Sequence, residues 1–200
     1  MTAVAIIPAR GGSQRIHGKN WKEFHGKPII QYSIETATRS GLFDQIVVTT
    51  DSQEIADVSH AAGAFVVWRP AALARDEVGT QDVASATVAL FKSWPKYACC
   101  IYPTAPMMLP QDLHLGRQLL LQNEGAHDYA MAVGTEPLRD AGQWYWGKAE
   151  AFNNRRRLIS PRTLMVPIEE ERVCDINYLA DWDFALKKYT AMVNKEKGTK

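Results

Sequence analysis

Several features that would place the protein at a membrane or on nucleic acid are missing from the sequence. No apolar stretch reaches membrane-spanning length, and the N-terminus lacks a charged segment followed by a long apolar core. An excess of one charge is also missing, because 23 basic and 22 acidic residues leave a net charge of +1. We therefore expect a cytoplasmic protein whose main partners include neither membranes nor nucleic acids.

Cysteine is scarce as well. Cys99, Cys100 and Cys174 are an odd number in no metal-like spacing, so we expect buried thiols in a reducing compartment. The chain length of 200 residues and the hydrophobic fraction of 46% fit one globular domain with a sizeable core. We predict that this domain covers residues 1–193 and that residues 194–200 form a disordered tail.

Two common phosphate-binding motifs are absent. The sequence has no GxGxxG, and Gly12 and Gly18 are one residue too far apart for a Walker A motif. Asn20 also stands where that motif has the Ser or Thr that binds magnesium. The loop at residues 8–20 is therefore neither a Walker A motif nor a dinucleotide fingerprint.

This glycine-rich stretch, PARGGSQRIHGKN at residues 8–20, directly follows an apolar run that predicts a buried first strand. Its glycines allow a tight turn and a close approach to a ligand, and its cations lie within ten residues of each other. The residues concerned are Gly11, Gly12, Arg10, Arg15 and Lys19. A bent cationic loop at a strand end suits a polyphosphate, and the alternative is a surface turn with scattered basic residues.

Strand and helix patterns alternate along the rest of the chain. Apolar and β-branched runs predict strands at residues 45–50, 65–68, 97–102, 128–133, 144–146 and 164–168. Helices are predicted at residues 28–41, 52–62, 80–93, 110–122 and 181–189. This order indicates an α/β fold with a mostly parallel sheet covered on both faces, and its ligands should bind at the carboxyl ends of the strands. Arginines 155–157 are interpreted as a solvated turn, with a phosphate clamp as the alternative.

The loop at residues 8–20 resembles the N-terminal loop of the nonulosonate cytidylyltransferases, which activate sialic acid and its relatives. In that family a PARGGSKRIPGKN-like loop follows a strand and wraps the triphosphate of CTP. Gln14 stands where the family usually has Lys, and His17 where it usually has Pro. The first difference removes a charge that would face the phosphates.

Further segments resemble the same family in the same order. RPAALARDE begins at Arg69 and resembles a segment near the nucleotide; the alternative is that Arg69 pairs with Asp76 and only orders the loop. YPTAP begins at Tyr102 and resembles the pseudaminic acid branch, where sialic acid enzymes have QPTSP; a plain strand-end turn is the alternative. Two prolines flanking Thr104 fix the backbone and present polar groups to a base.

DAGQWYWG, which contains Gln143, is a second marker of that branch. An amide beside aromatic residues suits an acetamido sugar, although without the resemblance the aromatics would be assigned to the core. VCDIN lies where the family has a DxD-like pair, so Asp175 and Asn177 are the implied ligands of Mg2+. Asn177 replaces the second carboxylate, and an amide oxygen binds magnesium more weakly.

The resemblance implies a three-layer α/β/α fold of the nucleotide-diphosphosugar transferase type. It also implies the reaction of CTP with a nonulosonic acid, most simply pseudaminic acid, to give a CMP-sugar and pyrophosphate. The implied catalytic cations are Arg10, Arg15 and Lys19. The implied nucleotide contacts are Arg10, Gly11, Gly12, Ser13, Lys19, Asn20, Arg69, Thr80 and Thr104, and the implied sugar contacts are Tyr102 and Gln143.

Alternatives remain open at this level. One alternative is a cytidylyltransferase for sialic or legionaminic acid, and the other is a catalytically weak nucleotide-binding homologue. In the family a longer segment precedes DAGQ and helps to build the sugar pocket and a dimer contact, whereas here residues 134–139 join the strand to this motif almost directly. The expected partners are therefore CTP and a nonulosonic acid, while the homodimer implied by the family lacks that segment.

Overall fold

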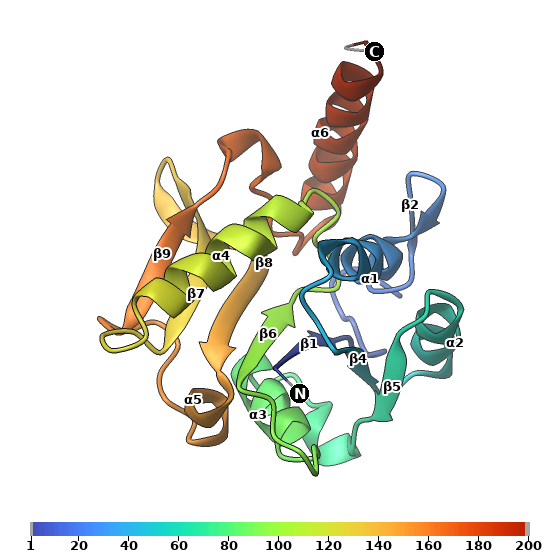
Figure 1. Ribbon diagram of the computed structural model, residues 1–200. Coiled ribbons are helices and arrows are strands. Elements are labelled where there is room, and N and C mark those ends of the chain that lie inside the picture. Colours follow the sequence, from blue (N-terminus) through green and yellow to red (C-terminus); the bar gives the residue numbers. More distant parts are fainter. Residues whose placement is uncertain (1, 199–200) are drawn as a thin grey trace.

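The computed structural model describes residues 2–198, which form a seven-stranded sheet between helical layers (Figure 1). The strand order is β5-β4-β1-β6-β8-β7-β9. The strands are β1 (Ala3–Pro8), β4 (Gln45–Thr50), β5 (Phe65–Trp68), β6 (Tyr97–Ile101), β7 (Tyr129–Thr135), β8 (Leu138–Lys148) and β9 (Thr163–Pro167). All neighbouring pairs are parallel except the two that include β8.

Alternate residues of the central strand β1 point into two separate cores. Ala5 and Ile7 pack with residues of α1 (Ile29–Ser40), α2 (Gln53–Ala61) and α4 (Pro110–Gln122) on one face. Val4 and Ile6 pack with residues of α3 (Thr80–Val88) and α5 (Ala149–Asn153) on the other. The predicted three-layer α/β/α fold is therefore confirmed.

A third, smaller core lies at the carboxyl end of the sheet. There the last helix, α6 (Leu179–Gly198), packs Trp182 and Ala185 against Phe24 of the short hairpin of β2 (Glu23–Phe24) and β3 (Lys27–Pro28). Figure 1 shows α6 projecting from the sheet beyond this contact. The carboxyl edge of the sheet is thus partly covered by the β2–β3 hairpin, from the N-terminal part of the chain, and by the C-terminal helix α6.

The strand β8 departs most from the predicted pattern. We expected a short aromatic strand at residues 144–146, but β8 has 11 residues and runs antiparallel to both neighbours. The connection from β7 consists of Glu136 and Pro137, and a connection this short can join only antiparallel strands. Trp144 and Trp146 fill one core and Tyr145 the other, so the aromatic residues of this motif belong to the core.

The C-terminal helix is also longer than predicted. It continues through Gly198, so residues 194–198, assigned above to a disordered tail, are helical, and residues 199–200 lie outside the described residues. Lys and Glu are good helix formers, which explains why the polar tail extends the helix. The three cysteines are free and buried, as expected. No helix within residues 2–198 has the length and apolar character needed to cross a membrane.

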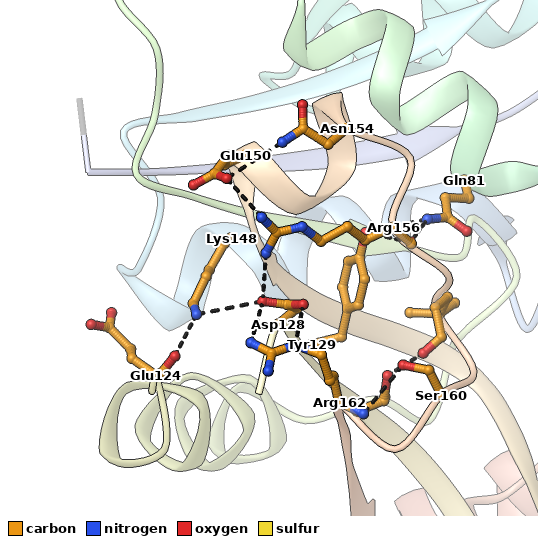
Figure 2. A network of polar contacts seen from close by, with 12 residues as sticks. Gln81, Glu124, Asp128, Tyr129, Lys148, Glu150, Asn154, Arg156, Ser160 and Arg162 are labelled. Carbon is orange, nitrogen blue, oxygen red and sulfur yellow. Dashed lines mark hydrogen bonds and ion pairs between the residues drawn. The ribbon is translucent and has the colours of Figure 1, made fainter. Parts of the chain in front are cut away.

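A polar network at the amino end of β7 fixes the turn that contains the consecutive arginines (Figure 2). The carboxylate of Asp128 is 2% exposed; Arg162 Nε lies 2.7 Å from Oδ2, and Arg156 Nη1 lies 3.0 Å from Oδ1. The side chain of Gln81 in α3 donates to the Arg156 carbonyl and, at 3.2 Å, to the Tyr129 hydroxyl. The turn is therefore tied to the first turn of α3, and Arg156 has a structural role.

We expect Asp128→Asn to destabilise the protein by about 1–2 kcal/mol near neutral pH, since the surrounding cations are partly exposed and screened. Hydrogen bonding from Arg162, with the charges of Arg156 and Lys148, lowers the pKa of Asp128 to about 2. The unfolded value is about 3.9, so the stabilisation is present above pH 4 and is lost as the pH falls toward 2. Urea unfolding of both proteins across this range measures the effect.

Asp183→Asn, at an exposed carboxylate, is the control for a general change of charge. A difference between wild type and Asp128→Asn that stays constant from pH 7 to pH 2 would contradict the assignment.

Candidate functional site

A cavity of about 370 Å³ opens at the carboxyl ends of the parallel strands, where the predicted loops meet. Apolar walls come from Pro8, Ile16, Val78, Val83 and Pro103. Polar walls come from Arg10, Ser13, Gln14, Arg15, Lys19, Asn20, Arg69, Asp76, Thr80, Tyr102, Thr104 and Asn177. Arg10, Arg15 and Lys19, the three cations of the loop at residues 8–20, thus line the same cavity.

The path of this loop depends on a close approach at Gly11. Its backbone N–H donates to Asp51 Oδ1 at 2.8 Å, and a Cβ atom at this position would lie 2.9 Å from Ser52 Cβ. Ser52 cannot retreat freely, because its hydroxyl caps the first turn of α2. Gly11 therefore acts by packing, whereas a Cβ at Gly12 would meet nothing within 4 Å.

Two further contacts hold the cationic side of the loop. Asn20 is 5% exposed, and its amide donates to the Arg10 carbonyl at 2.9 Å, which closes the loop on itself. The ammonium group of Lys19 donates to the Ile176 carbonyl at 2.6 Å. Burial lowers the pKa of Lys19, Asp175 opposes this shift, and the charges of Arg15 and Arg10 add to it. An anion in the cavity would stabilise the charged form of Lys19.

Arg10 is paired with Asp76, which also lines the cavity. The alternative role of Arg69, a salt bridge to Asp76, is absent from the described ion pairs. Arg69 is instead 8% exposed, donates to the Thr49 carbonyl at 2.8 Å and keeps Nε unpaired. Burial lowers its pKa and nearby Asp51 opposes that shift, so Arg69 is a buried cation at the cavity wall.

The first residue of α3, Thr80, lines the cavity too. The amino end of a helix carries partial positive charge and unpaired N–H groups, which favour an anion. Because the network around Asp128 anchors the neighbouring Gln81, this helix end has a fixed position. The cavity thus combines side-chain cations with a helix terminus.

Tyr102 lies at the rim. Its backbone N–H donates to the Gln143 carbonyl at 2.8 Å, and its hydroxyl lies 3.4 Å from Asp140 Oδ2. Desolvation and the charge of Asp175 raise the pKa of Asp140, while a hydrogen bond from the Gly142 N–H opposes the shift. The side chain of Gln143 does not reach the cavity: it is 1% exposed and donates to the Arg172 carbonyl at 2.8 Å.

The two expected magnesium ligands lie side by side. Asn177 Nδ2 donates to Asp175 Oδ2 at 2.6 Å, and only Asn177 lines the cavity. Asp181 accepts the backbone N–H groups of Asn177 and Tyr178 at 2.9 and 2.7 Å, which fixes the start of α6. Within residues 2–198, no three His, Cys, Asp or Glu side chains are grouped so that they could hold a metal ion.

The structure therefore gathers most of the predicted site residues around one cavity. Outside its lining lie Gly11, Gly12, Gln143 and Asp175. Sequence reasoning missed the placement of Asp76, which pairs with Arg10 across 66 positions of sequence, and of Asp140, which lies 38 positions from its partner Tyr102. No simple alternation along β8 could have placed Asp140, because the β7–β8 register shifts between Met131 and Val133 and Gly142 has φ +65°.

Comparison with known proteins identifies the family. Residues 4–145 match the family model described as cytidylyltransferase. The chain belongs to the cytidylyltransferase family. The resemblance found in the sequence is thereby confirmed at the level of the family.

Among curated relatives, the pseudaminic acid cytidylyltransferase of Campylobacter jejuni strain 81-176 is 30% identical, over 98% of this chain and 99% of its own length. The CMP-N,N'-diacetyllegionaminic acid synthase of Legionella pneumophila is 38% identical over 56% of this chain and 50% of its own length.

Among solved structures, a CMP:2-keto-3-deoxy-manno-octonic acid synthetase complexed with CTP has a TM-score of 0.75 at 18% identity. The match covers 98% of this chain and 100% of that one. Rv0371c of Mycobacterium tuberculosis H37Rv, in complex with manganese, has a TM-score of 0.65 at 14% identity, over 94% of this chain and 99% of the other. At these identities the likeness shows the fold.

We expect Asp76→Asn to tighten CTP binding, because the triphosphate no longer competes with a carboxylate for Arg10. The pair is partly exposed, so the dissociation constant should fall by a factor of about two to five at low salt, which corresponds to ~0.4–1 kcal/mol. Calorimetry measures it. Glu77→Gln, at the adjacent exposed carboxylate, is the matched control. Weaker binding in Asp76→Asn would show that Asp76 itself contacts the nucleotide.

Proposed function

We propose that the chain joins CTP and a nonulosonic acid, with pseudaminic acid as the favoured sugar, to give a CMP-sugar and pyrophosphate. The observation that carries this proposal is the convergence of Arg10, Arg15 and Lys19 with the amino end of α3 on one cavity. The relative matched over nearly its whole length, a pseudaminic acid cytidylyltransferase, supports the choice of sugar. So does Tyr102, which stands where sialic acid enzymes usually have Gln and lines the cavity.

The reaction depends on position and charge. The anomeric hydroxyl of the sugar attacks the α-phosphorus of CTP, the bond to the β-phosphate oxygen breaks, and pyrophosphate leaves. Arg10, Arg15 and Lys19 neutralise the charge on the phosphates, and Arg10 exchanges Asp76 for a phosphate oxygen as CTP binds. Ser13, Asn20, Arg69, Thr80 and Thr104 position the nucleotide; all five line the cavity.

Asp175 and Asn177 are the residues that would hold Mg2+. Their oxygen donors fit a hard cation that proteins bind with one or two carboxylates together with substrate phosphates. When bound, magnesium would neutralise phosphate charge. The present hydrogen bond from Asn177 to Asp175 leaves the amide oxygen of Asn177 free to face a cation, since the nitrogen is the atom that points at the carboxylate.

The chain lacks part of its relatives' sequence. The alignment with the C. jejuni relative spans 236 positions, more than the 200 residues present here. The tight β7–β8 connection at Glu136 and Pro137 stands where the family resemblance places a longer segment that helps to form the sugar pocket and a dimer contact. A catalytically weak homologue is the alternative that this difference favours.

Pyrophosphate release from CTP, measured with pseudaminic, legionaminic and sialic acids, tests the function. We expect the highest kcat/KM with pseudaminic acid and no release with ATP in place of CTP. Highest activity with another of the three acids would reassign the sugar. CTP binding without release from any sugar would identify the weak homologue.

We expect Asn177→Asp to strengthen magnesium binding, because the variant places two carboxylates in hydrogen-bonding proximity without the amide donor. Like-charge repulsion should lower the melting temperature in EDTA, and magnesium should raise it more than in wild type. The magnesium concentration for half-maximal pyrophosphate release should fall as well. Lys92→Gln changes one charge at an exposed residue outside the cavity lining, and is the control for general salt effects. Identical magnesium responses in variant and wild type would remove Asn177 from the metal site.

A further inference from the structure

The hydroxyl of Tyr102 has a fixed polarity at the rim of the cavity. Its neighbour is Asp140, whose Oδ2 lies 3.4 Å from the hydroxyl oxygen. In this contact the tyrosine hydroxyl donates to Asp140, since an ionised carboxylate only accepts hydrogen bonds. While its proton is directed at Asp140, the phenol oxygen has only lone pairs to offer to a second partner.

Both members of this pair are held in place. The Tyr102 backbone is held by its N–H, which donates to Gln143, and by its carbonyl, which accepts from the Ser33 hydroxyl at 2.8 Å. The ring packs edge-to-face on Tyr145, with the centroids 6.1 Å apart. A tyrosine fixed at both backbone groups and along its ring holds its phenol oxygen in one position, beside Asp140.

Asp140 is held through Gly142. The Gly142 N–H donates to Asp140 Oδ1 at 2.8 Å, so the two oxygens have separate donors. Gly142 has φ +65°, and a Cβ there would lie 3.0 Å from Asp175 Cβ. Only glycine adopts this conformation and leaves this space readily, so the turn that aims Asp140 at Tyr102 requires Gly142.

We propose that Tyr102 and Asp140 form an acceptor-only subsite that selects a hydrogen-bond donor of the sugar, an acetamido N–H or a hydroxyl. This inference rests on the proposed function and concerns how the enzyme selects its sugar substrate. Asp140 is a positioning residue that acts through Tyr102. An anionic group of the sugar would find no donor at the Tyr102–Asp140 pair and would be repelled by the carboxylate, so the sugar's own carboxylate points elsewhere.

The test is steady-state kinetics of the full chain with pseudaminic acid varied at saturating CTP. Tyr102→Phe removes the acceptor. Asp140→Asn supplies an amide that can donate to Tyr102, so the phenol proton is no longer held away from the cavity. Each variant should raise the sugar KM about ten-fold, the value of one hydrogen bond, with a smaller change in kcat. The double variant should be no worse than either single one.

Three controls separate this role from a structural one. The dissociation constant for CTP should stay within two-fold in every variant, and the melting temperature should stay within a few degrees. Asp140→Glu keeps an acceptor-only group and should recover part of the lost sugar affinity. An analogue that lacks the selected donor should lose affinity in wild type but not in Tyr102→Phe.

The outcomes are distinguishable. An active enzyme whose sugar KM is unchanged in both single variants overturns the subsite alone. Equal losses of sugar and CTP affinity, or additive losses in the double variant, also overturn it, because the two residues then act separately or on the fold. A wild-type protein that binds CTP but turns over no nonulosonic acid overturns the proposed function, and the subsite falls with it.

Discussion

The contact between Gly11 and the end of β4 is the constraint on which the cavity depends. The loop after β1 must pass over Ser52 closely enough that a Cβ would lie 2.9 Å from the serine Cβ, and its N–H must reach Asp51. Next to Gly11, the side chain of Arg10 lines the cavity. The loop is closed by Asn20, whose side-chain amide donates to the Arg10 carbonyl. A larger residue would displace the loop, because α2 holds Ser52 through its cap. The glycine therefore helps to set the position of the cations that line the cavity, although it does not line the cavity itself.

The sequence predicted the layers well because the buried strands are short apolar runs separated by helical patterns. It failed at β8, because the strand contains Asp140, Gly142 and Gln143, which weaken a β pattern, and because antiparallel pairing depended on a two-residue connection. Most of the cavity lining was predicted for a different reason: the loops of parallel strands meet at one edge whatever their sequence separation. What no local pattern could supply was the pairing of groups far apart in sequence, such as Arg10 with Asp76.

Gln143 shows the limit of reading a motif residue by residue. It lies in the segment that resembles a sugar-binding stretch, yet its side chain is buried and donates to Arg172, a residue that itself binds Asp112 at 2.9 Å. Its backbone carbonyl, rather than its amide, serves the site by accepting from Tyr102. The same segment contributes Asp140, which precedes the turn at Gly142 and lies 3.4 Å from the Tyr102 hydroxyl. The motif thus supports the site through backbone and a carboxylate, and its aromatic residues pack the core.

The C-terminal segment completes the arrangement by joining the cationic loop to the candidate metal residues. Lys19 donates to the Ile176 carbonyl, 157 positions away, and Asp175 and Asn177 flank that carbonyl. Because Ile176 is buried in the core that α6 closes, the carbonyl cannot move independently of the helix. The position of the Lys19 ammonium relative to Asp175 therefore depends on the packing of α6 as well as on the loop at residues 8–20. Burial and the nearby charges of Arg15 and Arg10 lower the pKa of Lys19, while Asp175 opposes the shift, so the segment that anchors this ammonium also supplies a carboxylate that favours its charged form.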